Sequence, residues 1–191
     1  MLKHTIFLFL AVTCFQLCTA APGDAKRCVF SIEVIRDGAG FKPLGYKVVG
    51  DGIFLYEHSD GQITAERYQQ WDIQGGAPRE PQREVFAGGK AFTQRVRDLF
   101  KKSAIRELDF PAVHAAVLAA QQAMPEGGIL ITNGPSVRIY ADLEGTRFTF
   151  SYEGLGSSLR FYADYNEKLR ALKTLLDGVA YEYGRARIFL D

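Results

Sequence analysis

The chain has 191 residues, of which 23 are Lys or Arg and 22 are Asp or Glu, so its formal charge is +1. This near-neutral balance lacks the basic excess that binds nucleic acid or anionic membranes, and we expect neither partner. Aromatic residues make up 13% of the sequence, mostly Phe and Tyr, which suits a core rich in β-sheet. The length fits one domain with a core large enough to fold without disulfides.

Residues 1–20 have the pattern of a cleavable signal peptide. A short basic start precedes the uncharged apolar run Thr5–Phe15, and small residues lead to Ala20, after which we predict the cut. The run is too short to span a bilayer, and no comparable run follows, so we expect no transmembrane segment after cleavage. The pattern predicts an exported protein, periplasmic or secreted. A lipoprotein modified at Cys14 or Cys18 is the alternative, although the residues before both cysteines suit lipid attachment poorly.

Residues 21–191 are predicted to form a single domain. The leader contains one lysine and no acidic residue, so the remainder is formally neutral. Of the three cysteines only Cys28 remains, and one cysteine cannot form an internal disulfide. We interpret Cys28 as a small residue at the start of a strand, with a nucleophile or an intermolecular bridge as alternatives.

Strand patterns dominate the first part of this domain. Strands are predicted at Cys28–Arg36, Tyr46–Val49, Ile53–His58 and Gln62–Ile73. They are expected to form an antiparallel meander, with Gly50-Asp51-Gly52 as a tight turn. Gln74–Gly89 contains four glycines and two prolines without a clear period, and is predicted to be a long loop.

Helices follow this loop. Apolar residues recur at helical spacing in Lys90–Ser103 and in Pro111–Met124. A third helix is predicted to begin after Asp164, with Glu167 completing a capping box. Its expected core stripe is Leu169, Leu172, Leu176, Val179 and Tyr183.

A second set of strands lies before the last helix. These strands are predicted at Ile129–Thr132, Val137–Leu143, Thr146–Tyr152 and Leu159–Tyr162. The two middle ones alternate apolar and polar residues on either side of Glu144-Gly145, which indicates a hairpin with one buried face. The order of elements predicts an α+β fold with an antiparallel sheet of about six to eight strands and three helices, mostly packed on one face.

The segment from Gly45 to Gly52 reads GYKVVGDG, and Tyr56 follows on the next predicted strand. With the order of elements that follows, it resembles an uncharacterised family of bacterial exported domains. Members pair a strand tyrosine and a DG turn with a second strand tyrosine. The cysteine-and-proline signature that precedes the first tyrosine in that family is absent here. The resemblance implies an exported α+β domain and no particular activity.

One cluster of residues could bind a metal ion or take part in catalysis. His58 ends a predicted strand beside Glu57 and Asp60, and these three could bind a divalent ion or act as acid and base. Because they lack ligand spacing, they suit an ordinary hairpin turn as well. His114 is expected on the surface of its helix, or partly buried there. Gly154–Ser158 is predicted to be a turn between strands and not a nucleophile elbow.

We predict no cofactor and no metal, because no phosphate loop, dinucleotide fingerprint or calcium loop occurs. Two surfaces remain as candidates for recognition. The first is the outward face of the predicted hairpin, with Arg138, Tyr140, Asp142, Arg147 and Thr149, although an ordinary solvent-facing sheet would look the same. The second is Trp71 with the loop that follows, including Arg79, Arg83 and Phe86, although Trp71 would also suit the core of a plain connector.

These observations favour a non-enzymatic binding module of the cell envelope, whose partner is a protein or another envelope component. The predicted contact residues are Trp71, Arg79, Arg83, Arg138, Tyr140 and Arg147. The alternative is a small hydrolase or metal-dependent enzyme that uses His58, Glu57 and Asp60.

Overall fold

The computed structural model describes residues 25–35, 46–73, 82–125 and 134–182, and only the backbone of residues 46–49, 71–73 and 86. The predicted signal peptide at residues 1–20 therefore lies outside the described residues. The same is true of Arg79, of the predicted strand Ile129–Thr132 and of Tyr183.

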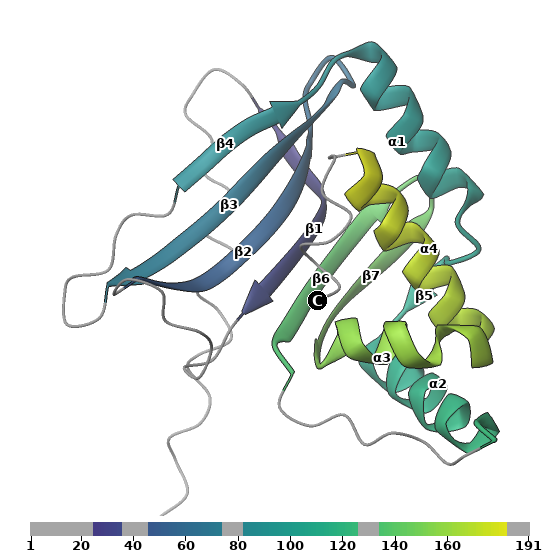
Figure 1. Cartoon of the computed structure of the whole chain (residues 1–191). Helices are drawn as coiled ribbons and strands as arrows, with labels where there is room; N and C mark the ends of the chain where they lie inside the picture. Colours follow the sequence, from purple (N-terminus) through teal and green to yellow (C-terminus); the bar gives the residue numbers. More distant parts are fainter. Residues whose placement is uncertain (1–24, 36–45, 74–81, 126–133, 183–191) are drawn as a thin grey trace, which may run out of the picture.

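One seven-stranded sheet forms the centre of the fold (Figure 1). Its strands, in spatial order, are β4 (Gln82–Ala87), β3 (Ile63–Ile73), β2 (Tyr46–Glu57), β1 (Arg27–Ile35), β6 (Ser136–Leu143), β7 (Thr146–Glu153) and β5 (Glu107–Leu108). Neighbouring strands pair antiparallel, except that β5 runs parallel to β7. The predicted α+β class with a mainly antiparallel sheet is confirmed.

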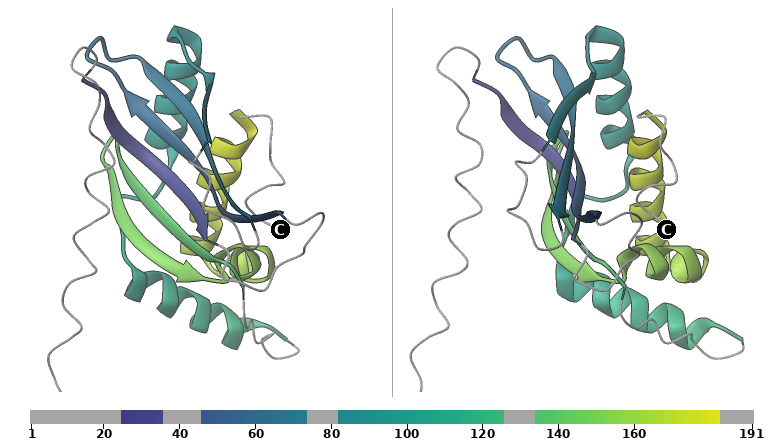
Figure 2. Two further views of the ribbon diagram at one scale, coloured as in Figure 1. Left: turned by 90° about the vertical axis from the view of Figure 1, so that its left-hand side faces the viewer. Right: turned by 60° about the vertical axis from the view of Figure 1, so that its left-hand side comes forward.

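The helices gather on one side of this sheet (Figure 2). They are α1 (Lys90–Lys102), α2 (Phe110–Ala123), α3 (Leu155–Tyr162) and α4 (Glu167–Glu182), with a short 3-10 helix η2 (Ala163–Tyr165) before α4. Alternate residues of the central strands, such as Phe30 and Ile139, are fully buried against helix residues such as Phe100 and Leu172. Each large apolar side chain buried in this layer contributes roughly 1.5–3 kcal/mol to stability.

The predicted turn at Gly50-Asp51-Gly52 is wrong, because these residues lie inside the continuous strand β2. Gly52 pairs with Glu33 on one side and with Tyr68 on the other. A Cβ at Gly52 would lie 2.9 Å from the carbonyl oxygen of Ile32. The close approach of β1 therefore requires this glycine, and strand pairing on both sides overrides the turn tendency of the sequence.

The predicted loop at Gln74–Gly89 is wrong over residues 82–87, which form strand β4. Gln82 to Val85 are exposed, so this strand has no apolar face for a periodic pattern to reveal. β4 forms because it pairs antiparallel with β3 at the edge of the sheet.

The predicted strand Leu159–Tyr162 is wrong, because these residues belong to α3. Leu155, Leu159 and Tyr162 are buried at helical spacing. Gly154 begins the helix with φ of 68°, so the predicted turn at Gly154–Ser158 joins a strand to a helix and not two strands. A four-residue segment that contains Arg160 is too short to separate the two periods, and the described residues form four α-helices where three were expected.

The start of the last helix also differs from the prediction. The side chain of Asn166 accepts hydrogen bonds from the backbone N–H groups of Lys168 and Leu169 at 3.0 and 3.3 Å, and so replaces the predicted Asp164 cap. Asp164 lies in η2. The predicted core residues of α4 that the structure describes, Leu169, Leu172, Leu176 and Val179, are buried.

We expect Gly52→Ala to lower the free energy of unfolding by about 2 kcal/mol, because the new methyl group would press against the backbone of β1. Urea unfolding followed by circular dichroism measures this change. Gly50→Ala is the matched control in the same strand, since the nearest atom to its new Cβ would be a Tyr68 ring carbon at 3.5 Å. Equal stability of the two variants would contradict the explanation.

Candidate functional site

The β6–β7 hairpin presents one buried face and one accessible face, as predicted. Glu144 and Gly145 form the turn with φ of 52° and 79°, the positive values that two-residue hairpins favour. Val137, Ile139, Ala141 and Leu143 are buried towards the helices. Between them, Arg138, Tyr140 and Asp142 are half-buried on the opposite face.

A cavity of about 610 Å³ lies beside this hairpin, where β5 ends. It is lined by Glu107, Leu108, Asp109, Ala112, Tyr140, Asp142, Arg147, Phe148 and Thr149. Two of the predicted contact residues, Tyr140 and Arg147, therefore lie in one cavity. Its other wall comes from β5 and the start of α2, which the sequence did not indicate as part of a site.

Two hydrogen bonds fix the segment around β5 against β7. The Thr146 hydroxyl donates to the Ile105 carbonyl at 3.0 Å, and the Arg147 backbone N–H donates to the Arg106 carbonyl at 2.7 Å. Asp109 then caps α2, because its carboxylate accepts from the Ala112 backbone N–H at 2.8 Å. β5 consequently stops after two residues, and the chain turns away from β7 to leave the cavity.

The charges around the cavity are mostly acidic. Asp142 accepts a hydrogen bond from Arg27 at 2.9 Å and lies 3.6 Å from Nε of Arg147. Glu107 and Asp109 are exposed and make no ion pair with the described residues. The side chain of Arg147 is 78% exposed and so is available to a ligand.

Tyr140 is the aromatic group on the sheet side of the cavity. It lies opposite Ser31 of β1 and Thr149 of β7. Burial raises the pKa of the Tyr140 hydroxyl above its ordinary value of 10.0, so the phenol is neutral near neutral pH and can donate a hydrogen bond.

An aromatic cluster on β2 and β3 continues the same sheet face. The ring of Phe54 stacks on Tyr56 and meets Tyr68 edge to face, both at 6.1 Å between centroids. The ammonium group of Lys26 lies 4.3 Å from the centre of the Tyr56 ring. Cys28 lies opposite Tyr56 and is half-buried. Phe54 and Tyr56 already alternate within the predicted strand Ile53–His58, but only the pairing of β2 with β3 brings Tyr68 beside them.

Arg138 and Arg83 lie on this face outside the 610 Å³ cavity. Arg138 is the direct cross-strand partner of Glu33. Burial raises the pKa of Glu33, and the charges of Arg138 and Arg83 oppose that shift. Arg83 also lines a smaller cavity of about 270 Å³ at the β3–β4 edge. Trp71 lies in β3 and its side chain is not described.

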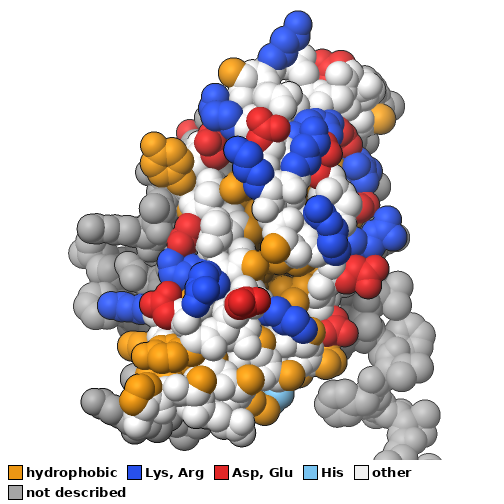
Figure 3. All heavy atoms as spheres, turned by 90° about the vertical axis from the view of Figure 1, so that its right-hand side faces the viewer, with side chains coloured by type: hydrophobic (Ala, Val, Ile, Leu, Met, Phe, Trp, Pro, Cys, Tyr) orange, Lys and Arg blue, Asp and Glu red, His pale blue; other side chains and the backbone are white. Residues whose placement is uncertain are grey.

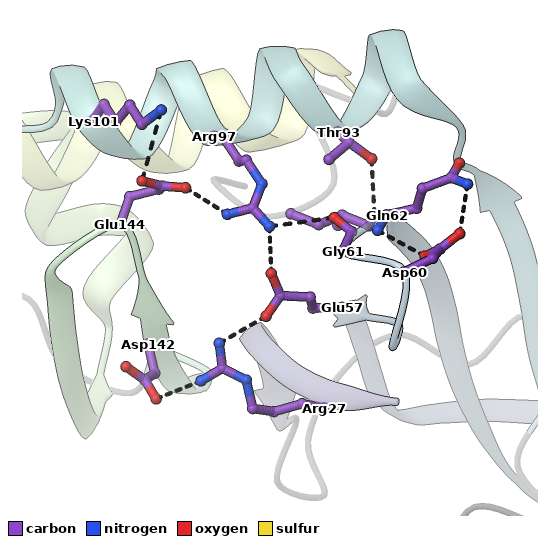
Figure 4. Close-up of polar contacts among 11 residues, drawn as sticks. Arg27, Glu57, Asp60, Gly61, Gln62, Thr93, Arg97, Lys101, Asp142 and Glu144 are labelled. Atoms are coloured by element: carbon purple, nitrogen blue, oxygen red, sulfur yellow. Dashed lines mark hydrogen bonds and ion pairs between the residues drawn. The ribbon is translucent and has the colours of Figure 1, made fainter. Parts of the chain in front are cut away.

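The three residues of the enzyme alternative have separate partners, and Figure 4 shows those of Glu57 and Asp60. The carboxylate of Glu57 pairs with Arg27 at 2.8 Å and also with Arg97. Nε2 of His58 lies 2.8 Å from the Thr64 hydroxyl. Asp60 accepts from the backbone and the side chain of Gln62. None of these hydrogen bonds or ion pairs joins two of the three side chains, so none supports the hydrolase or metal-dependent alternative. That alternative stays a prediction.

Glu57 belongs to a chain of ion pairs that joins α1 to the sheet (Figure 4). Arg97 of α1 bridges Glu57 on β2 and Glu144 in the hairpin turn. Arg27 continues the chain from Glu57 to Asp142 at the cavity. The network thus holds the hairpin turn, and with it one wall of the cavity, against α1.

His114 is exposed on α2, as expected. Its ring stacks on Phe110 at 5.6 Å, and its Nδ1 lies 3.4 Å from the Tyr152 hydroxyl. These three rings lie beside β7, next to the cavity but not in its lining.

No protein-family model matches the chain, and no curated protein or solved structure is significantly similar to it. The resemblance carried by Gly45–Gly52 and Tyr56 therefore stays a prediction. Within the part of the chain that the structure describes, no group of His, Cys, Asp and Glu side chains is arranged to hold a metal ion. None of the described helices has the length and apolar character needed to cross a membrane.

We expect the stabilising effect of Glu57 to vanish in acid. The hydrogen bond from Arg27 lowers the pKa of Glu57 below its ordinary value of 4.5, and Arg97 acts in the same direction. A carboxylate with a lowered pKa stabilises the fold above the unfolded-state pKa, and this stabilisation is lost as the pH falls through the folded-state pKa. Glu57→Gln should cost about 1–2 kcal/mol near pH 7 and progressively less below about pH 4.

Urea unfolding of the wild type and of Glu57→Gln between about pH 7 and pH 3 tests this pH dependence. Glu84→Gln serves as the control, because Glu84 is exposed on β4 and makes no ion pair with the described residues. A loss for Glu57→Gln that does not change with pH would contradict the expectation.

Proposed function

We propose that this chain is an exported, non-enzymatic binding module of the cell envelope, which holds a partner in the cavity between β6, β7 and the start of α2. The observation that supports the proposal is the convergence of Tyr140 and Arg147 on one cavity of about 610 Å³. The size lies in the range of ligand sites, and Tyr and Arg are the side chains that recognition surfaces use most.

The lining supplies both parts of a recognition site. Leu108, Ala112 and Phe148 offer apolar contact, and a ligand that covers them removes that surface from water. Tyr140 and Arg147 provide hydrogen-bond donors, while the nearby carboxylates accept. In a ligand site, a few polar groups among apolar side chains fix the orientation of the ligand.

Binding is favoured over catalysis by the side chains that line the cavity. The lining contains no histidine, cysteine or serine. Those residues are common catalytic nucleophiles and bases, and two of the carboxylates in the lining already have other roles, since Asp109 caps α2 and Asp142 pairs with Arg27. His114, the histidine closest in the chain to the cavity lining, stacks on Phe110 and approaches the Tyr152 hydroxyl instead.

We expect the double variant Tyr140→Ala/Arg147→Ala to lose its envelope partner. The purified wild-type and variant proteins, each with a C-terminal tag, are used to capture partners from an envelope extract, and stoichiometric species are quantified by mass spectrometry. The variant should retain at most about a tenth of the wild-type partner, because it loses an aromatic anchor and the hydrogen-bond donors of an exposed guanidinium group.

Lys102→Ala is the matched control, because it also removes one positive charge, on the exposed end of α1 and outside the cavity. It should capture the partner as the wild type does. Equal capture by the double variant and the wild type would contradict the cavity as the binding site. Unchanged circular dichroism and thermal unfolding are required of both variants.

A further inference from the structure

The outer edge of β7 is largely uncovered by other strands. β5 pairs with β7 at Glu107↔Arg147 and Leu108↔Phe148 only. Among the described residues, no strand lies beside the next five residues of β7, Thr149 to Glu153. An unpaired strand edge offers a row of backbone N–H and C=O groups to an added strand.

The direction of these backbone groups follows from Arg147. Its N–H donates to the Arg106 carbonyl, away from β6. In an antiparallel pair this orientation recurs at every second residue, which places the backbone groups of Thr149, Ser151 and Glu153 on the outer side. The side chains of all three are exposed.

The two edges of the sheet differ in their protection. β4, at the far edge, pairs with β3 through an irregular register and carries Arg83 and Glu84. The segment Thr149–Glu153 contains neither lysine nor proline, and the pairing of β6 with β7 has no bulge. Lysine, proline and a bulge, three of the devices that prevent strand addition, are therefore missing from Thr149–Glu153.

The surroundings of this edge are acidic on one side and apolar on the other. Glu107, Asp109 and Glu153 are exposed, and the first two make no ion pair with the described residues. On the helix side, Phe110 is 48% exposed and packs against Tyr152 at 5.5 Å between ring centres. Hydrophobic side chains gather there over α2, below a largely charged surface (Figure 3).

We propose that the partner bound at this site is an extended basic segment of a protein, which pairs with Thr149–Glu153 as an additional strand. Alternate side chains of an added strand point to opposite faces. One row, rich in Lys or Arg, faces Glu107 and Asp109, while the other row is apolar and lies against Phe110. Backbone pairing supplies affinity, and the two rows supply selectivity. The inference rests on the proposed function and specifies its ligand.

The probe is a fluorescein-labelled heptapeptide in which lysine alternates with valine, and fluorescence anisotropy measures its binding to the purified full chain. A glutamate-for-lysine peptide should bind at least about tenfold more weakly, because its charges face Glu107 and Asp109. The pair Glu107→Gln/Asp109→Asn should weaken the lysine peptide about tenfold as well. Asparagine keeps the cap of α2, so this variant should unfold at the wild-type temperature.

Backbone pairing is tested separately from charge. Two further lysine peptides carry N-methyl groups on the amides of either the lysine or the valine residues. One of the two methylated peptides should lose at least about tenfold in affinity, and the other should lose little. The reason is that only the alternate N–H groups of an added strand face β7. If both methylated peptides bind like the parent, strand addition is overturned.

Ser151→Pro removes one outward N–H from β7 and should weaken the lysine peptide about tenfold. Ser151→Ala is the matched control and should bind normally, since both variants lose the 3.0 Å contact between the Ser151 and Ser136 hydroxyl oxygens. Circular dichroism confirms that both are folded. Equal binding by both folded variants overturns the proposal.

Two outcomes separate this inference from the proposed function. If neither the lysine peptide nor the glutamate peptide binds while Tyr140→Ala/Arg147→Ala still abolishes capture, the site holds something other than a basic strand, and only the present inference fails. The protein could instead sediment as a dimer. If Ser151→Pro dissociates this dimer and the lysine peptide does not dissociate it, a second copy occupies the edge and the inference is overturned.

Discussion

Burial of one face of the sheet beneath the helices determines which side chains of this protein can reach a ligand. In β6 and β7 every second residue is committed to the core, from Val137 to Tyr152. The residues between them must then face outward, because successive side chains of a strand alternate. Tyr140 and Arg147 reach the cavity for this reason, and a slip of one residue would bury both.

The cavity depends equally on where the neighbouring strand stops. Thr146 and Arg147 tie residues 105–106 to β7, and two residues later Asp109 begins α2. Helix capping and strand pairing compete for the same short segment, and the cap takes over after Leu108. The cavity and the uncovered edge of β7 both result because β5 ends at Leu108 and α2 begins directly afterwards.

The ion-pair chain from α1 to Asp142 gives the hairpin a fixed place. Glu144 adopts a positive φ in the turn and is also held by Arg97 at 2.5 Å and by Lys101 at 3.8 Å. These groups are partly buried, so their attraction is screened less than that of exposed pairs. Glu57, a candidate catalytic residue by sequence, serves this network with its carboxylate.

Much of the fold could be read from the sequence where one period was clear. The β6–β7 hairpin, α1, α2 and the core stripe of α4 each follow from apolar residues at a spacing of two or of three to four. β4 could not be found in this way, because Gln82 to Val85 are exposed and only pairing with β3 makes this segment a strand. The four apolar and polar residues of Leu159–Tyr162 fitted both periods, and packing against α4 and β6 decided for a helix.

The sequence by itself determined the antiparallel α+β class and the outward face of the hairpin, and so four of the cavity residues, Tyr140, Asp142, Arg147 and Thr149. These are local properties, since alternation within one strand decides them. Only the tertiary structure decided that Glu107, Asp109 and Ala112 complete the cavity and that Gly52 lies within a strand. The completion of the cavity and the position of Gly52 both depend on the close approach of segments that are distant in the chain. The periodicity of side chains within one segment does not show which other segments will pack against it.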